Sequence, residues 1–222
     1  YKARLVAQGF SQKYGIDYDE TFSPVVRFES IRTIIALAAS FKLKLNQMDV
    51  KTAFLNGELK ENIYMKQPEG FIVKGSEHLV CKLRRSIYGL KQSARCWNAE
   101  FDSHLKRMGF SQLDCDPCIY IKVENGNVFV IAVYVDDIIL AGHNDELVKE
   151  VKSAIASKFN ITDMGEMNHL LGVKVVQNCA TKKIWIGQTS YAKEMLKRFK
   201  MEESNPTDTP VDIGMKLMKM KD

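Results

Sequence analysis

The sequence contains no run of eighteen apolar residues and no signal peptide, so we expect no transmembrane helix. Cysteine is scarce, and the five cysteines are an odd number at irregular spacing, which is typical of a reducing compartment. Cys115 and Cys118 have the spacing of a zinc site, but no second Cys or His pair follows nearby to complete four ligands. We therefore interpret them as ordinary cysteines.

Internal repeats and low-complexity segments are also missing. The chain has 222 residues, 45% of them hydrophobic, which is enough for one large or two small domains with a core. It begins at Tyr1 without Met and ends in a lysine-rich tail. We therefore expect a piece of a longer polypeptide.

Positive charge is modest overall, at +5, but it is unevenly distributed. Residues 82–107 alone carry seven Lys or Arg against two acids. Cations interleaved with Tyr88 and Trp97 suit a phosphate backbone, although a solvated helix face often has the same composition. The seven cations are Lys82, Arg84, Arg85, Lys91, Arg95, Lys106 and Arg107.

The apolar periodicity predicts an α+β fold. An Asn-Gly pair at 125–126 predicts a hairpin turn, and Ser93 is expected to cap a helix. Strands are predicted over residues 2–8, 43–50, 63–65, 78–83, 119–123, 128–133, 138–141, 170–176 and 184–187, and helices near 29–41, 94–108, 148–155 and 192–199.

Two adjacent acids, Asp136 and Asp137, separate the apolar runs 128–133 and 138–141. The runs predict antiparallel strands joined by a tight turn with both acids at its tip. Interior carboxylates are usually paired or bound to metal, so the pair indicates a divalent cation. Successive strand residues point to opposite faces, and we expect Asp136 to be the primary ligand. Taken alone, an Asp-Asp turn is more often an ordinary surface turn.

A third carboxylate, Asp49, ends the predicted strand 43–50, far from the pair along the chain. Two strand ends of one sheet could bring Asp49 and Asp136 together around two Mg²⁺ ions about 3.5–4 Å apart, the arrangement used for in-line displacement at phosphorus. An aspartate at a strand end is also commonly a turn former or a helix cap.

Four blocks of sequence resemble the reverse transcriptase domain of copia-type LTR retrotransposons. They occur in order over nearly the whole chain, and four blocks at their spacing are far more specific than any one of them. The blocks are residues 2–10 (KARLVAQGF), 47–57 (QMDVKTAFLNG), 86–95 (SIYGLKQSAR) and 134–137 (YVDD). Ala94 departs from the proline that this family usually has after Ser93, which leaves the local turn in doubt.

The resemblance implies a catalytic triad of Asp49, Asp136 and Asp137 that binds two Mg²⁺ ions, with Asp136 binding both and Asp137 less essential. Val50 would offer its backbone carbonyl as a further ligand. Phe54 falls where these polymerases hold an aromatic ring against the sugar of the incoming nucleotide. A rigid ring there can exclude a 2′-hydroxyl by shape.

Other residues take their implied roles from the same resemblance. Arg4 and Lys2 would bind the triphosphate. Tyr88, Gly89 and Lys91 would line the nucleotide and template pocket, where Gly89 allows close backbone approach. The residues implied to grip the primer end are Leu171, Gly172 and Val173, and Lys158 lies near the place of a proton donor to pyrophosphate.

The implied architecture is a right-hand polymerase in which an antiparallel sheet backed by helices forms the palm. Residues 1–188 would form the fingers and palm, interleaved, and residues 189–222 the start of the thumb and a connecting segment. The implied reaction is the addition of a deoxynucleotide to a primer 3′-hydroxyl. Two other classes stay open: a non-catalytic nucleic-acid-binding remnant, and another palm-domain nucleotidyltransferase such as a cyclase.

The implied partners are an RNA template, a DNA primer or RNA–DNA hybrid, and dNTPs, with no membrane. Other Pol domains, such as an integrase and a ribonuclease H, would be joined in the parent polyprotein. The expected location is intracellular, in cytoplasmic particles encoded by the element.

Overall fold

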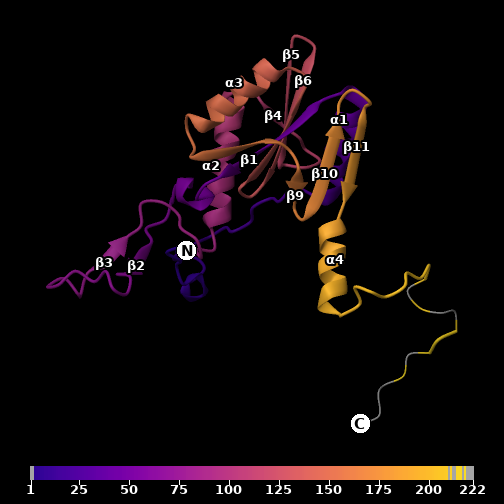
Figure 1. Ribbon diagram of the computed structural model, residues 1–222. Helices are drawn as coiled ribbons and strands as arrows, with labels where there is room; N and C mark the ends of the chain where they lie inside the picture. Colours follow the sequence, from indigo (N-terminus) through magenta and orange to yellow (C-terminus); the bar gives the residue numbers. More distant parts are fainter. Residues whose placement is uncertain (1–2, 210, 212–213, 217, 219–222) are drawn as a thin grey trace.

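The structure is a computed structural model that describes residues 3–209, 211, 214–216 and 218 (Figure 1). At its centre is a six-stranded antiparallel sheet with the strand order β4-β5-β6-β7-β1-β8. This agrees with the predicted antiparallel sheet. Its strands are β1 (Lys44–Val50), β4 (Ser111–Gln112), β5 (Ile119–Glu124), β6 (Asn127–Tyr134), β7 (Asp137–Gly142) and β8 (Ile161–Glu166).

Both faces of this sheet are buried, because successive side chains of its strands enter two different cores. On β6, Ile131 and Val133 belong to one core, whereas Val130 and Ala132 belong to the other. Helices α2 and α3 cover the first face, and α1 with a three-stranded sheet covers the second (Figure 1). These elements are α1 (Phe28–Phe41), α2 (Ser93–Arg107), α3 (Asp145–Ala156), β9 (His169–Leu170), β10 (Val173–Asn178) and β11 (Lys183–Gly187).

A smaller unit extends from the sheet at the lower left of Figure 1. It consists of the hairpin of β2 (Tyr64–Lys66) and β3 (Val80–Lys82), the segment 3–8 and the segment 83–91. Its core is a separate cluster of four buried residues, and we call it the N-terminal unit. The four residues are Ala7, Ile63, Ile87 and Leu90.

Short helical turns and a last helix complete the described chain: η1 (Gly9–Ser11), η2 (Ala53–Asn56) and α4 (Thr189–Arg198). Helix α4 follows the predicted pattern, but none of its residues is buried. Among the described residues, no helix is both long enough and apolar enough to cross a membrane.

Three local predictions are wrong. Residues 3–8 form no strand, because the segment lies beside no partner strand and only the Ala7 N–H is bound, to the Tyr88 carbonyl at 2.8 Å. Residues 170–176 are two strands rather than one, since Leu171 and Gly172 both have positive φ and form a turn. Ser93 is the first residue of α2 instead of its cap, and its buried hydroxyl donates to the Ile87 carbonyl.

Two strands were not predicted: the two-residue β4 and the longer β8. Strand β8 pairs with the outer edge of β1, and most of its side chains are exposed or half-buried. An edge strand of this kind has little apolar alternation, which is the signal that sequence patterns rely on.

Candidate active site

The turn between β6 and β7 carries the two adjacent acids. Tyr134 ends β6 and pairs with Asp137, the first residue of β7, so Val135 and Asp136 are the two central residues of the turn. Val135 has φ +55°, and this sign at the first central position is that of a type II′ hairpin turn. A β-branched residue is strained there. The prediction of both acids at the tip is therefore corrected: Asp136 is in the turn and Asp137 is on the strand.

Two hydrogen bonds fix this turn to neighbouring elements. The indole N–H of Trp97 on α2 donates to the Val135 carbonyl at 2.7 Å, and the N–H of Val50 donates to the Asp136 carbonyl at 2.8 Å. Trp97 is buried, with the rings of Phe101 and Phe159 each 5.1 Å away. Both carbonyls of the turn residues are thus bound, which counters the strain at Val135.

The antiparallel register brings the distant Asp49 to this turn. Asp49 on β1 is the partner of Asp137 on β7. Gln47, two residues earlier on the same face of β1, donates its side-chain N–H to Asp137 Oδ1 at 3.0 Å. Gln47 is 6% exposed. We did not predict a role for it, although its place two residues before Asp49, on the same face of the predicted strand, was the available signal.

The pKa of Asp137 reflects its burial and the two carboxylates beside it. Burial raises the pKa of Asp137, the hydrogen bond from Gln47 lowers it, and the negative charges of Asp136 and Asp49 raise it further. A divalent cation would relieve the repulsion among the three carboxylates, and oxygen donors suit Mg²⁺. Within the described part of the chain, however, no group of three His, Cys, Asp or Glu side chains is arranged to hold a metal ion. The donor chemistry therefore fits Mg²⁺, but the carboxylates would have to turn toward a common point.

Three of the residues implied to contact the nucleotide form a row. Phe54 on η2 lines a small cavity of about 180 Å³ together with Val135. The ring of Tyr88 lies 4.5 Å from the Phe54 ring, centroid to centroid, and the Arg4 guanidinium carbon lies 5.5 Å from the Tyr88 centroid. The row Arg4–Tyr88–Phe54 therefore runs from the N-terminal unit to the cavity beside the acid-bearing turn.

Gly89 and Lys91 connect the segment 86–91 to the N-terminal segment. Gly89 has φ +93°, and a Cβ atom there would lie 2.1 Å from the Ala7 carbonyl oxygen, so only glycine permits this contact. Lys91 donates to the Tyr18 hydroxyl at 3.0 Å and to the Gln12 carbonyl at 3.3 Å. Lys2 lies outside the described residues.

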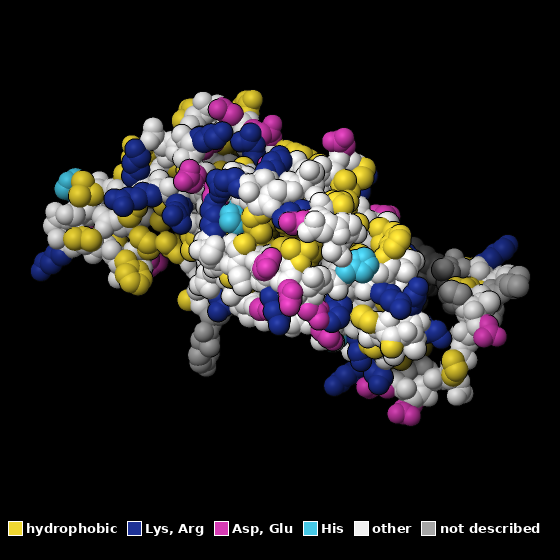
Figure 2. All heavy atoms as spheres, turned by 90° about the horizontal axis from the view of Figure 1, so that it is seen from above, with side chains coloured by type: hydrophobic (Ala, Val, Ile, Leu, Met, Phe, Trp, Pro, Cys, Tyr) yellow, Lys and Arg dark blue, Asp and Glu magenta, His cyan; other side chains and the backbone are white. Residues whose placement is uncertain are grey.

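The remaining predicted residues lie on other elements. Leu171 and Gly172 form the turn between β9 and β10, with φ of 48° and 79°, and Val173 begins β10. Lys158 forms an ion pair with Glu100. All seven cations of residues 82–107 are exposed. On the face that Figure 2 shows, Lys and Arg side chains gather at the upper left and again at the lower right.

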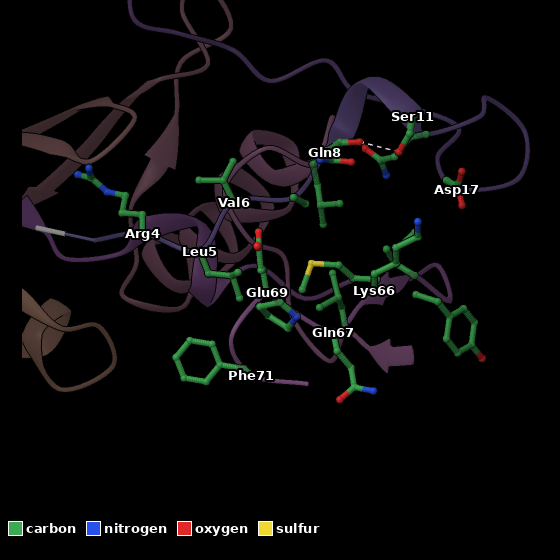
Figure 3. Close-up of a pocket in the computed structure, with 18 of the residues that line it drawn as sticks. Arg4, Leu5, Val6, Gln8, Ser11, Asp17, Lys66, Gln67, Glu69 and Phe71 are labelled. Atoms are coloured by element: carbon green, nitrogen blue, oxygen red, sulfur yellow. Dashed lines mark hydrogen bonds between the residues drawn. The ribbon is translucent and has the colours of Figure 1, made fainter. Parts of the chain in front are cut away.

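A groove of about 760 Å³ lies between the segment 3–8 and the β2–β3 hairpin. Figure 3 shows Arg4 toward one end and Asp17 toward the other, with Leu5 and Phe71 on the Arg4 side. The acid triad does not line this groove. Arg4 alone belongs both to the groove and to the row that leads to the turn.

An acid-bearing β-hairpin turn, with a third acid on the neighbouring strand of an antiparallel sheet, is the arrangement expected of a nucleotidyltransferase of the polymerase class. A family profile described as "Reverse transcriptase (RNA-dependent DNA polymerase)" matches residues 1–213, and the chain belongs to this family.

Known relatives agree with this assignment. The chain is 47% identical to the Retrovirus-related Pol polyprotein from transposon TNT 1-94 of Nicotiana tabacum, over 99% of this chain and 17% of the relative. It is 36% identical to the corresponding polyproteins from transposons RE2 and RE1 of Arabidopsis thaliana, over 98% of this chain and 15% of each relative. The predicted relationship to copia-type Pol polyproteins is confirmed, and the chain spans about one sixth of the length of these relatives.

Among solved structures, apo telomerase from Candida tropicalis, truncated from its C-terminal domain, matches 74% of this chain and 41% of that chain. The identity is 14% and the TM-score is 0.36, values too low to carry an argument.

Proposed function

We propose that this chain is the catalytic core of an RNA-directed DNA polymerase, which adds deoxynucleotides to a primer 3′-hydroxyl on an RNA template. The observation that carries the proposal is the pairing of Asp49 with Asp137, next to the turn that holds Asp136. The family membership supports the same reaction.

The proposed catalytic residues are Asp49, Asp136 and Asp137. Asp49, Asp136 and the Val50 carbonyl would hold two Mg²⁺ ions. When bound, these ions lower the pKa of the primer hydroxyl and stabilise the charge on the leaving pyrophosphate. One carboxylate oxygen of Asp137 already accepts from Gln47, which supports a lesser role for this residue than for Asp136.

The nucleotide would bind along the row Arg4–Tyr88–Phe54. The Arg4 guanidinium would contact the triphosphate, and the Phe54 ring would exclude a 2′-hydroxyl. Lys2, Gly89 and Lys91 complete the proposed nucleotide site. Leu171, Gly172 and Val173 would contact the primer end. The exposed cations of residues 82–107 would hold the RNA–DNA hybrid through its backbone, without reading its sequence.

In the proposed architecture, the six-stranded sheet with α2 and α3 is the palm, and the N-terminal unit is part of the fingers. Residues 1–188 make up these two parts, and residues 189–222 begin the thumb. The parent protein would also carry other Pol domains, such as an integrase and a ribonuclease H, and would act in cytoplasmic particles encoded by the element.

Primer extension on an RNA template tests the proposal. The 222-residue chain should extend a DNA primer with Mg²⁺ and should stop when EDTA is added. Asp136→Asn should lower the rate by about 10²–10³-fold, the usual cost of removing one electrostatic contact in a transition state. Asp114→Asn, at an exposed aspartate outside the proposed site, is the matched control and should keep the rate. Equal incorporation by the Asp136→Asn variant and the unmodified chain would contradict the mechanism.

One observation favours a second candidate function, a non-catalytic nucleic-acid-binding remnant. In the described residues the three acids do not converge into a metal-holding group. Binding of an RNA–DNA hybrid with no incorporation at any Mg²⁺ concentration would support this candidate instead.

A further inference from the structure

The backbone of Phe54 is hydrogen-bonded to the segment that begins at Ser86. The Ser86 hydroxyl donates to the Phe54 carbonyl, and the Ser86 N–H donates to the Gly57 carbonyl at 2.9 Å. The Gly57 N–H in turn donates to the Phe54 carbonyl at 3.2 Å. Ser86 is fully buried, at 0% exposed, so these bonds are shielded from water. The backbone of Phe54 is therefore fixed by residues 57 and 86.

The ring of Phe54 is supported by Tyr88, two residues beyond Ser86. The two rings are tilted by 54° with their centroids 4.5 Å apart, which is a favourable packing distance for an aromatic pair. The backbone of Tyr88 is held by one hydrogen bond, in which its carbonyl accepts from the Ala7 N–H at 2.8 Å. Its ring packs against the ring of Phe54 and limits the space into which that ring can move.

The position of the Phe54 ring matters because the ring would exclude a 2′-hydroxyl by steric contact alone, without a hydrogen bond. A ring that rejects one extra oxygen does so only while it cannot move aside. Ser86 holds the backbone of Phe54, and Tyr88 limits the movement of its ring.

We propose that Tyr88 is a positioning residue for sugar discrimination, acting through the ring of Phe54, with Ser86 fixing the backbone of Phe54. This inference rests on the proposed polymerase function. It gives Tyr88 a role in choosing between deoxyribose and ribose, in addition to the general lining role that the sequence implied.

The test measures discrimination, defined as kcat/KM for a dNTP divided by kcat/KM for the matching rNTP, in primer extension by the 222-residue chain. Tyr88→Leu should lower discrimination by about 2- to 10-fold, the factor that corresponds to one aromatic pair. Tyr88→Phe keeps the ring and should keep the discrimination. Ser86→Ala should also lower discrimination, and it provides a second measurement if Tyr88→Leu does not fold.

Three further variants separate this role from other effects. In a Phe54→Ala background, Tyr88→Leu should have no further effect on discrimination, because its target ring is gone. Arg4→Gln should lower kcat/KM for dNTP and rNTP by the same factor and so leave discrimination unchanged. That outcome would show that losing the Arg4 contact to Tyr88 does not explain the effect of Tyr88→Leu. Tyr64→Leu, at an exposed tyrosine on β2, should leave discrimination unchanged.

The possible failures are distinguishable. If Phe54→Ala lowers discrimination but neither Tyr88→Leu nor Ser86→Ala does, the positioning role is overturned while the polymerase function stands. The role is also overturned if Tyr88→Leu has the same effect with and without the Phe54 ring. If the unmodified chain incorporates no nucleotide, the proposed function fails and this inference fails with it.

Discussion

The six-stranded sheet and the N-terminal unit differ greatly in how much apolar surface they bury. Most residues of β6 and β7 are buried, with one core on each face. The N-terminal unit has a core of only four buried residues, and many of its apolar side chains stay exposed, including Leu5 at 55% and Phe71 at 79%. Since burial of apolar surface is the main source of stability, the sheet should be much the more stable region.

The residues of the proposed site are divided between these two regions. The three acids lie on β1, on β7 and in the turn before β7, and the well-packed sheet can keep such groups in fixed positions. Arg4 and Tyr88 lie on the N-terminal unit, which buries less apolar surface but holds the Tyr88 backbone through the hydrogen bond from the Ala7 N–H. Phe54 contacts both regions, because it packs against the first core of the sheet and against Tyr88.

The largest expected effect is the loss of stability when a large side chain in one of the two regions is truncated. Leu140→Ala on β7 should lower the free energy of unfolding by about 2–5 kcal/mol, because it leaves a cavity in a dense core. Ile63→Ala in the N-terminal unit should cost less, since its surroundings can collapse. Urea denaturation followed by circular dichroism compares the two variants. Equal losses would contradict the difference in packing between the two regions.

The second prediction concerns the support of the turn by Trp97. Trp97→Phe keeps an aromatic ring but leaves the Val135 carbonyl without its donor, which should cost about 1–3 kcal/mol of stability. The rate of primer extension should fall by more than in a variant of similar stability with a change in the other core, such as Ile31→Val on α1. Val135→Gly removes the strain in the turn, so the effect of Trp97→Phe on the rate should be smaller in that background. An unchanged effect would show that Trp97 does not act through the turn.

The smallest effect is expected for Asp137→Asn in EDTA. The fold raises the pKa of Asp137 above its ordinary 3.8, so the folded state favours the protonated form. The stability associated with that form is present below pH 3.8 and is lost as the pH rises through the raised pKa. The neutral Asn side chain should therefore give a higher Tm than Asp at pH 7 and still accept from Gln47. Thermal scans from pH 3 to pH 8 test this, and a Tm difference that does not depend on pH would contradict it.

Local patterns were sufficient for the elements with strong periodicity. The apolar runs on either side of Asp136 predicted β6 and β7, and Asn125 and Gly126, both with positive φ, form the predicted hairpin turn. The segment 3–8 has the composition of a strand but pairs with none, and β8 pairs in the sheet without strand-like alternation. In both cases the presence of a partner strand, which local sequence does not contain, decided the outcome.

Residue types and their spacing along the chain were enough to predict the acid-bearing hairpin, the family resemblance and the list of candidate residues. The folded chain added three facts: Asp49 pairs with Asp137, Gln47 and Trp97 donate to Asp137 and to the turn, and Tyr88 packs against Phe54. Each of these contacts joins residues more than thirty positions apart. Such contacts arise from strand register and from the packing of helices on the sheet, and no local periodicity encodes them.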